Sequence, residues 1–203
     1  MNTQSASGFP NKAYYSTIAT PDGPFSIIVA SDFSNNPGAV LASGWTEDID
    51  ALRVLIHPTL RPAQLISADR ASQSGVLTIL GQAVAAVKAY YAGDYNAPRQ
   101  IPVLQCSGDF RQRAWEVLRG IKPGEPVTYR ELAARCGNPS AVRAAAGACA
   151  SNTVALFVPC HRVLRSDGSM GGFRYGIDLK LALLKRENAP DKGDYTSGNP
   201  LSS

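Results

Sequence analysis

Apolar runs near the start of the chain predict a small antiparallel sheet. The runs at 14–20 (YYSTIAT) and 25–31 (FSIIVAS) are rich in β-branched, aromatic and aliphatic residues. Between them, the sequence Pro-Asp-Gly-Pro at 21–24 is a strong turn signal, so the two runs form a hairpin. A further apolar run, Val40 to Trp45, adds a third strand after the turn-forming residues 35–38.

A helical pattern follows in the first half of the chain. From Leu77 to Tyr91 the apolar residues recur at helical spacing, and Gly93 ends the pattern. We expect the Leu, Val and Tyr side of this helix to lie in the core. His57 is the single histidine of this half and precedes a proline, so we assign it a structural role.

After Pro102 the pattern changes to short helices. Asp109 is expected to cap a helix that ends before Gly120. Thr128 and Glu131 have the spacing of a capping box and predict that a second helix begins there. Gly-Asn-Pro at 137–139 then breaks the helix.

Ser140 is expected to cap a third helix, and the pair forms a helix-turn-helix. This third helix, at 141–151, consists almost entirely of small residues, and Arg143 is its one long basic side chain. Such a helix can lie in a DNA groove, or it can be a tightly packed core helix. The segment alone favours the core helix.

These elements predict an α+β protein with two domains. We expect an amino-terminal α/β domain with a small antiparallel sheet at 13–100. A mostly helical, winged-helix-like domain carrying the helix-turn-helix follows at 101–188. Residues 1–12 and 189–203 are polar and are expected to form flexible tails.

Composition excludes several classes of protein. Of the 203 residues, 44% are hydrophobic and 18% are charged, which is typical of a globular domain rather than a disordered chain. The sequence contains neither a run of about 18 apolar residues nor a signal-peptide core, so we expect a cytoplasmic protein without a membrane partner.

Charge differs between the two halves. Residues 1–104 hold 6 Lys+Arg and 7 Asp+Glu, whereas residues 105–203 hold 14 and 9. Any contact with a polyanion is therefore expected in the second half, although a solvated basic surface explains the charge equally well.

Four cysteines, at 106, 136, 149 and 160, lack the spacing of a disulfide framework or zinc cluster and indicate free thiols. Cys160 lies in the sequence Pro-Cys-His-Arg at 159–162, after a strand-like apolar run at 154–158. A neighbouring imidazole and guanidinium favour the thiolate, which is the nucleophilic form. Adjacent side chains on a strand point apart, so His161 would act on the thiol through a turn or one bridging water. Glu187 could orient the imidazole.

The motif Pro159-Cys160-His161-Arg162-Val163 resembles the active site of the O6-alkylguanine-DNA alkyltransferases. The resemblance extends over about residues 104–188 and rests on further matches. These are Tyr129 after Thr128, Arg143 as an intercalating arginine finger, the hinge asparagine Asn152, the pocket loop Gly168–Gly176 and the buried Glu187.

The resemblance implies transfer of an alkyl group from O6 of guanine in double-stranded DNA to Cys160, once per molecule and without a cofactor. The catalytic residues would be Cys160, His161, Glu187 and Tyr129. The DNA contacts would come from Arg143, Thr128, Tyr129, Ala144 and Gly147. The substrate pocket would be formed by Asn152, Pro159, Val163, Phe173 and Arg174.

The chain departs from the family at three positions. Thr153 follows the hinge asparagine where many members have proline, Phe173 replaces a frequent tyrosine, and Arg174 stands where some members have serine. The first half has no cysteine, so the zinc site of some relatives is not expected and we predict no metal. We expect a monomer; cooperative assembly on DNA stays open.

Two rival classes remain. A helix-turn-helix protein that binds lesions without catalysis would lack Cys160. A thiol hydrolase would need an oxyanion hole and a separately placed histidine, and it would leave Arg143 unexplained. The sequence does not indicate a preference among O6-alkyl groups.

Overall fold

The computed structural model describes residues 11–30, 38–70 and 75–188. The chain divides into two units, of which the first contains Met1–Ser107 and Thr153–Phe157 and the second contains Gly108–Asn152 and Val158–Ser203. The expected tails 1–12 and 189–203 lie outside the described residues apart from Asn11 and Lys12, and Lys12 begins the first strand.

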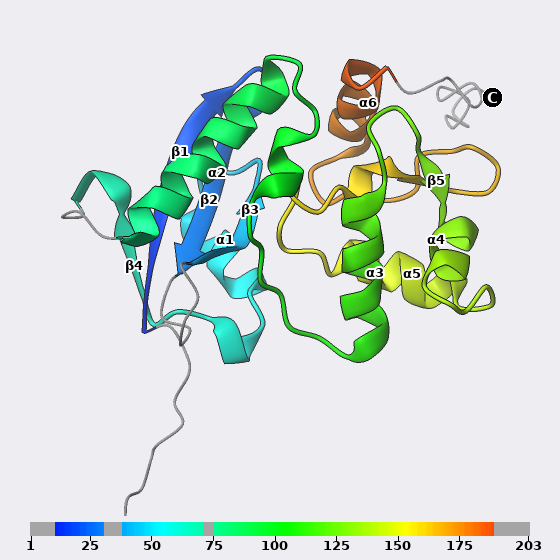
Figure 1. Cartoon of the computed structure of the whole chain (residues 1–203), viewed down its shortest axis with the longest axis horizontal. Helices are drawn as coiled ribbons and strands as arrows, with labels where there is room; N and C mark the ends of the chain where they lie inside the picture. The colour runs from blue at the N-terminus through cyan, green and yellow to red at the C-terminus, as the bar shows by residue number, and fades with distance from the viewer. Residues whose placement is uncertain (1–10, 31–37, 71–74, 189–203) are drawn as a thin grey trace, which may run out of the picture. The chain divides into compact units, whose positions relative to one another are not determined.

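The first unit contains a four-stranded mixed sheet (Figure 1), with the strand order β3-β2-β1-β4. Its strands are β1 (Lys12–Thr20), β2 (Gly23–Ala30), β3 (Ala39–Gly44) and β4 (Gln64–Ser67). β1 and β3 both pair antiparallel with β2, and β4 pairs parallel with β1. The predicted hairpin and third strand are confirmed. The turn expected at 35–38 lies outside the described residues, apart from Gly38.

Helices complete the first unit. They are α1 (Ile49–Leu55), α2 (Gly75–Tyr91) and the short 3-10 turns η1 (Pro58–Leu60), η2 (Ala68–Arg70) and η3 (Ala97–Gln100). Figure 1 shows α2 running along one face of the sheet, as its apolar side predicts. His57 is exposed and its Nδ1 accepts from the N–H of Thr59, which caps η1.

The segment Thr153–Phe157 contacts the sheet of the first unit but is not the strand that its apolar residues predict. The Ser43 N–H donates to the carbonyl of Thr153 at 2.9 Å, and the Ala155 N–H donates to the carbonyl of Ser43 at 3.2 Å. Leu156 then has φ 71°, a left-handed conformation that ends extended pairing. The strand prediction is therefore wrong beyond a single bridge between Ser43 and Val154.

The second unit is mostly helical. It contains the helices α3 (Asp109–Gly120), α4 (Tyr129–Arg135), α5 (Val142–Ala150) and α6 (Ile177–Arg186), the 3-10 turn η4 (Cys160–Arg162), and the strands β5 (Val127–Thr128) and β6 (Val163–Leu164). β5 and β6 pair in parallel. Together the two units form an α+β fold, as predicted.

The beginnings of the helices test the capping predictions. The capping box is confirmed, because Thr128 Oγ1 accepts from the Glu131 N–H at 3.1 Å and Glu131 Oε2 accepts from the Thr128 N–H at 2.5 Å. The other two predictions are wrong. The N-cap of α3 is Gly108, so Asp109 lies in the first turn of that helix. The N-cap of α5 is Ala141, and the Ser140 hydroxyl donates to Asn138 Oδ1 at 2.6 Å.

The small residues of α5 permit close packing against α3. Ala145 and Ala148 are fully buried, and Trp115 of α3 donates from its indole Nε1 to the carbonyl of Ala148 at 2.9 Å. One face of α5 is therefore a core face, as the structural interpretation of this helix required.

Candidate active site

Cys160 is held at the start of a tight turn rather than on a strand. Its backbone N–H donates to the carbonyl of Val158 at 2.8 Å, and residues 160–162 form η4. Asn152 braces this turn, since its side-chain Nδ2 donates to the Val158 carbonyl at 2.8 Å and to Cys160 Sγ at 3.3 Å. The amide that the sequence assigned to the pocket therefore touches the thiol directly.

The surroundings of the thiol act on its pKa in opposite directions. Burial raises the pKa of Cys160 above its ordinary value, while the hydrogen bond from Asn152 and the positive charge of Lys180 lower it. Arg174 adds a weaker favourable charge. The resting group is therefore a thiol that needs a base, and the positive charges around it favour the thiolate once the proton leaves.

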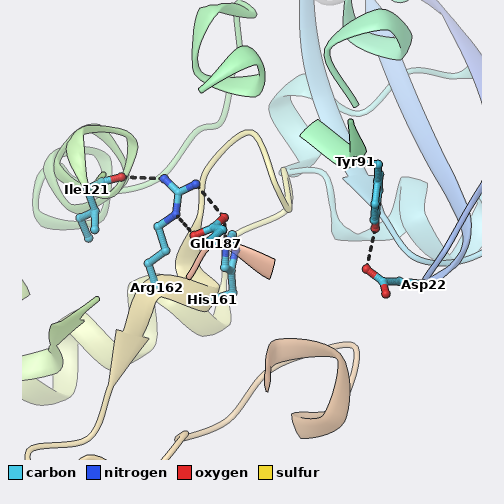
Figure 2. Close-up of polar contacts among 6 residues, drawn as sticks. All are labelled: Asp22, Tyr91, Ile121, His161, Arg162 and Glu187. Atoms are coloured by element: carbon cyan, nitrogen blue, oxygen red, sulfur yellow. Dashed lines mark hydrogen bonds and ion pairs between the residues drawn. The ribbon is translucent and has the colours of Figure 1, made fainter. Parts of the chain in front are cut away.

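His161 belongs to a buried network centred on Glu187 (Figure 2). The imidazole Nε2 lies 3.0 Å from Glu187 Oε1, and both side chains are almost completely buried. Arg162 donates from Nε and Nη2 to the two oxygens of the same carboxylate, each at 2.8 Å. Its Nη1 donates to the carbonyl of Ile121 at 2.6 Å. The predicted pairing of His161 with Glu187 is thus present in the geometry.

The network fixes the charge of each member. Burial alone would raise the pKa of Glu187, but the charges and hydrogen bonds of His161 and Arg162 outweigh it and lower this pKa to about 2. Burial lowers the pKa of His161, against the opposing effect of Glu187. An ionised Glu187 accepts from Nε2–H of a neutral imidazole, which leaves Nδ1 as the proton acceptor.

The role expected for Arg162 is wrong. The sequence suggested that its guanidinium would favour the thiolate of Cys160, two residues earlier in the chain. In the structure it is buried and turned to Glu187 and Ile121, where it holds the carboxylate that orients His161. A 3-10 turn has about 3 residues per turn, so side chains two residues apart point in different directions, and closeness in sequence does not place this charge beside Cys160.

Lys180 is a site residue that the sequence interpretation missed. Its side chain is fully buried, and Nζ donates to the carbonyl of Val163 at 2.6 Å and to the carbonyl of Met170. A signal was present, because Lys180 lies three, four and seven residues before Leu183, Leu184 and Glu187, which places all four on one helix face. That face enters the core.

Tyr129 and the glycine-rich loop meet closely. A Cβ on Gly171 would lie 2.8 Å from the Tyr129 hydroxyl oxygen, and Gly171 has φ 62°, so only glycine fits at this point. Burial and the nearby Cys149 and Cys160 raise the pKa of Tyr129 to about 12. Its hydroxyl therefore keeps its proton near neutral pH and can donate a hydrogen bond.

The other predicted pocket residues lie in this loop or beside η4. Arg174 is exposed and donates from Nη2 to the carbonyl of Ala150 at 2.7 Å, at the carboxyl end of α5, where a cation is favourable. Phe173 contacts Tyr175 edge to face at 5.7 Å between ring centroids. Pro159 is buried before η4, and Val163 follows η4, with its carbonyl bound to Lys180.

The outer face of α5 carries the predicted DNA-contacting residues. Arg143 and Ala144 are exposed and Gly147 is partly exposed, so this face presents one long cation among small side chains. Thr128 is occupied by the capping box, and Tyr129 begins α4 directly after it. The structure brings Tyr129 toward the loop and the thiol, and it places Arg143 at the surface.

The described helices and acidic, histidine and cysteine side chains bear on membrane and metal binding. None of the helices within residues 11–30, 38–70 and 75–188 combines the length and apolar character that a bilayer span requires. In the same part of the chain, no three His, Cys, Asp or Glu side chains are grouped in a way that could hold a metal ion. The prediction of no metal remains a prediction for the whole chain.

Residues 109–189 match the family described as 6-O-methylguanine DNA methyltransferase, DNA binding domain. The methylated-DNA–protein-cysteine methyltransferase of Haemophilus influenzae is 42% identical over 110 residues, which cover 53% of this chain and 62% of that protein. The bifunctional transcriptional activator/DNA repair enzyme Ada of Escherichia coli is 46% identical over 92 residues, 45% of this chain and 26% of that protein. The chain thus spans less than two thirds of the length of either curated relative.

The solved structure of Mycobacterium tuberculosis OGT in complex with DNA covers more of the chain. It is 30% identical, superposes with a TM-score of 0.63, and the match covers 87% of this chain and 95% of that one. The likeness therefore includes the first unit as well as the second. The chain belongs to the O6-methylguanine-DNA methyltransferase family.

Proposed function

We propose that the protein repairs DNA by transferring an alkyl group from O6 of guanine to Cys160, once per molecule. The observation that carries the proposal is the arrangement around this thiol. Asn152 contacts the sulfur, and the adjacent His161 is held by a buried, ionised Glu187. Such an arrangement activates a thiol for nucleophilic attack.

Access to the lesion requires the nucleotide to leave the base stack, at a cost of a few kcal/mol. The outer face of α5 is suited to this step, since its small residues allow close approach to the minor groove and Arg143 is exposed on it. The Arg143 guanidinium would fill the gap in the stack. Tyr129 would crowd the 3′ phosphate and help the nucleotide to rotate.

Proton transfer from the thiol comes next. The proton of Cys160 passes through one water molecule to Nδ1 of the neutral His161, and Glu187 stabilises the imidazolium that forms. Arg162 keeps Glu187 ionised and in place. The thiolate that remains is favoured by Asn152 and Lys180.

The thiolate then attacks the alkyl carbon in line. An S–C bond forms, the C–O6 bond breaks, and its electron pair goes to guanine. Tyr129 donates its hydroxyl proton to the ring nitrogen, so that guanine leaves as a neutral base, and solvent returns a proton to Tyr129 while the His161 imidazolium releases one. The product is an S-alkylcysteine thioether, which water does not hydrolyse at neutral pH, so each molecule acts once.

Counting the groups transferred tests this proposal against its rivals. The full chain is incubated with excess duplex oligonucleotide carrying O6-methylguanine, and methyl groups bound per protein molecule are measured over time. One group per molecule at the plateau is expected. A protein that only binds lesions would acquire none, and a thiol hydrolase would release product continuously.

Arg143 separates base flipping from chemistry. Arg143→Ala should slow the reaction with duplex DNA strongly, and it should change the reaction with free O6-benzylguanine far less, because the free base needs no flipping. Arg111→Ala, which removes an exposed arginine from α3, is the control for loss of charge. Equal losses on both substrates, with a lower melting temperature, would mean that Arg143 is a structural residue.

A further inference from the structure

Lys180 is a buried cation whose contacts the proposed mechanism does not yet explain. Its side chain is 0% exposed, and its ammonium donates to two backbone carbonyls, those of Val163 and Met170. Among the described residues, Lys180 forms no ion pair with a carboxylate. Neutral carbonyls satisfy hydrogen bonds but do not neutralise a charge, so a buried ammonium in this setting is costly.

The two carbonyls that Lys180 binds belong to two different segments of the site, the one after η4 and the glycine-rich loop. Val163 directly follows η4, which contains Cys160 and His161. Met170 directly precedes Gly171, the residue that contacts Tyr129. One ammonium therefore joins the segment of the nucleophile to the loop that approaches the proton donor.

The groups that face this ammonium come from three elements. They are Cys160 and His161 of η4, Cys149 of α5 and, after β6, Arg165. Cys160 in turn is faced by Lys180 and Arg174, and it acts on Tyr129 and Tyr175. Of the groups around Lys180, the thiol of Cys160 is the one that the proposed reaction converts to an anion.

We propose that Lys180 is a positioning residue that fixes the Val163 and Met170 carbonyls and supplies the counter-charge for the Cys160 thiolate. The role of Lys180 in alkyl transfer rests on the proposed function. The electrostatic coupling between the Lys180 ammonium and the Cys160 thiolate does not depend on that function. Burial lowers the pKa of Lys180 to about 8, and the nearby thiols oppose that change. The ammonium is therefore the form that the thiolate favours, and each charge stabilises the other.

Replacing the charge tests the coupling without DNA. Alkylation of Cys160 by iodoacetamide is followed from pH 6 to 10, with the label located on its peptide by mass spectrometry. For Lys180→Met, the midpoint of the rate profile should rise by about one pH unit, which lowers the rate near neutral pH about tenfold. Lys180→Arg keeps the charge and should restore most of the shift. Lys185→Met, an exposed change on the same helix, should match the wild type.

A second measurement covers the case in which Lys180→Met does not fold. The pH titration of the Lys180 ¹³Cε resonance is compared in wild-type protein and in Cys160→Ser. Loss of the thiolate should lower the Lys180 midpoint. Equal midpoints, or a folded Lys180→Met variant with the wild-type iodoacetamide profile, would overturn the inference.

Methyl transfer by the wild-type protein separates this inference from the proposed function. If the wild type takes no methyl group from O6-methylguanine duplex, the proposed function fails, while the iodoacetamide and NMR results still decide the coupling. If it does take one, Lys180→Met should slow the transfer near neutral pH and recover toward high pH. A purely structural lysine would lower the rate equally at every pH.

Discussion

Each unit contains a polar network built on one carboxylate (Figure 2), and the two networks differ in burial. In the first unit, the Tyr91 hydroxyl donates to Asp22 and accepts from the Trp45 indole, each at 2.9 Å. Asp22 lies in the hairpin turn and is partly exposed. In the second unit, the Glu187 side chain is 0% exposed and accepts from His161 and Arg162.

The difference shows which network can tolerate the loss of a partner. Water can replace a partner of the partly exposed Asp22, so this network fixes the end of α2 at moderate cost. Water cannot reach Glu187 without opening the core, so every donor must be present for its charge to be tolerated. The buried network therefore holds the imidazole in one orientation, as a base beside a nucleophile requires.

The largest expected effect comes from removing the buried charge. Glu187→Gln leaves the Arg162 guanidinium buried without its counter-charge and should lower the free energy of unfolding by about 3–5 kcal/mol. Asp22→Asn is the matched change in the first unit and should cost about 0.5–1.5 kcal/mol. Urea unfolding of both variants measures the difference. Equal losses would show that burial does not distinguish the networks.

Acid should weaken the network around Glu187. The folded pKa of Glu187 is lowered from 4.5 to about 2, so its contribution to stability is present above pH 4.5 and is lost as the pH falls toward 2. The stability of the wild type should fall across this range more steeply than that of Glu187→Gln. Unfolding measured at intervals between pH 5 and 2 checks this, and parallel curves would rule out an ionised Glu187.

Substitutions of glycine by alanine test the backbone of the two units. Gly171→Ala combines a left-handed φ with a clash against Tyr129, and it should cost about 1–3 kcal/mol and reduce alkyl transfer. Gly23→Ala in the hairpin has φ 107° but open space around it, so it should reduce stability without affecting transfer. Gly172→Ala is the control, with neither constraint. Unchanged transfer in Gly171→Ala would argue against the Tyr129 contact.

The smallest expected effect is in the first unit. Tyr91→Phe removes the hydroxyl between Trp45 and Asp22 and should cost about 1 kcal/mol. Burial raises the pKa of Tyr91 from 10 to about 12, so the hydroxyl stabilises the fold below pH 10 and loses this effect as the pH rises to 12. The difference in melting temperature between wild type and variant should therefore shrink over that range. A constant difference would exclude this titration.

Local rules predicted much of the fold from the sequence. The Pro-Asp-Gly-Pro turn and the capping box at Thr128 are set by the chemistry of a few neighbouring residues, and both are present. β4 was missed because four residues carry too short a pattern. The run at 154–158 was misassigned because its apolar composition reflects burial, while the left-handed Leu156 depends on its tertiary surroundings.

In the site, too, the sequence predicted the residues of the motif but not the contacts that depend on tertiary packing. Cys160, His161 and Glu187 were named from the motif and its spacing, and the structure brings His161 and Glu187 together. The roles of Arg162 and Lys180 could not be predicted from neighbouring residues, because their partners are distant in the sequence. The partners of Arg162 lie 25 and 41 residues away. Those of Lys180 lie 17 and 10 residues away. The groups toward which a buried Arg or Lys side chain points are set by how the whole fold packs.

The position of the transferred group tests the central claim, that the surroundings of Cys160 make it the nucleophile. The protein is incubated with duplex DNA carrying O6-methylguanine, digested, and mapped by mass spectrometry. The methyl group should lie on the peptide that contains Cys160, because Asn152 donates to its sulfur, whereas burial is the main influence on the Cys136 and Cys149 thiols and raises the pKa of both. A methyl group found on Cys106, Cys136 or Cys149 would contradict the account.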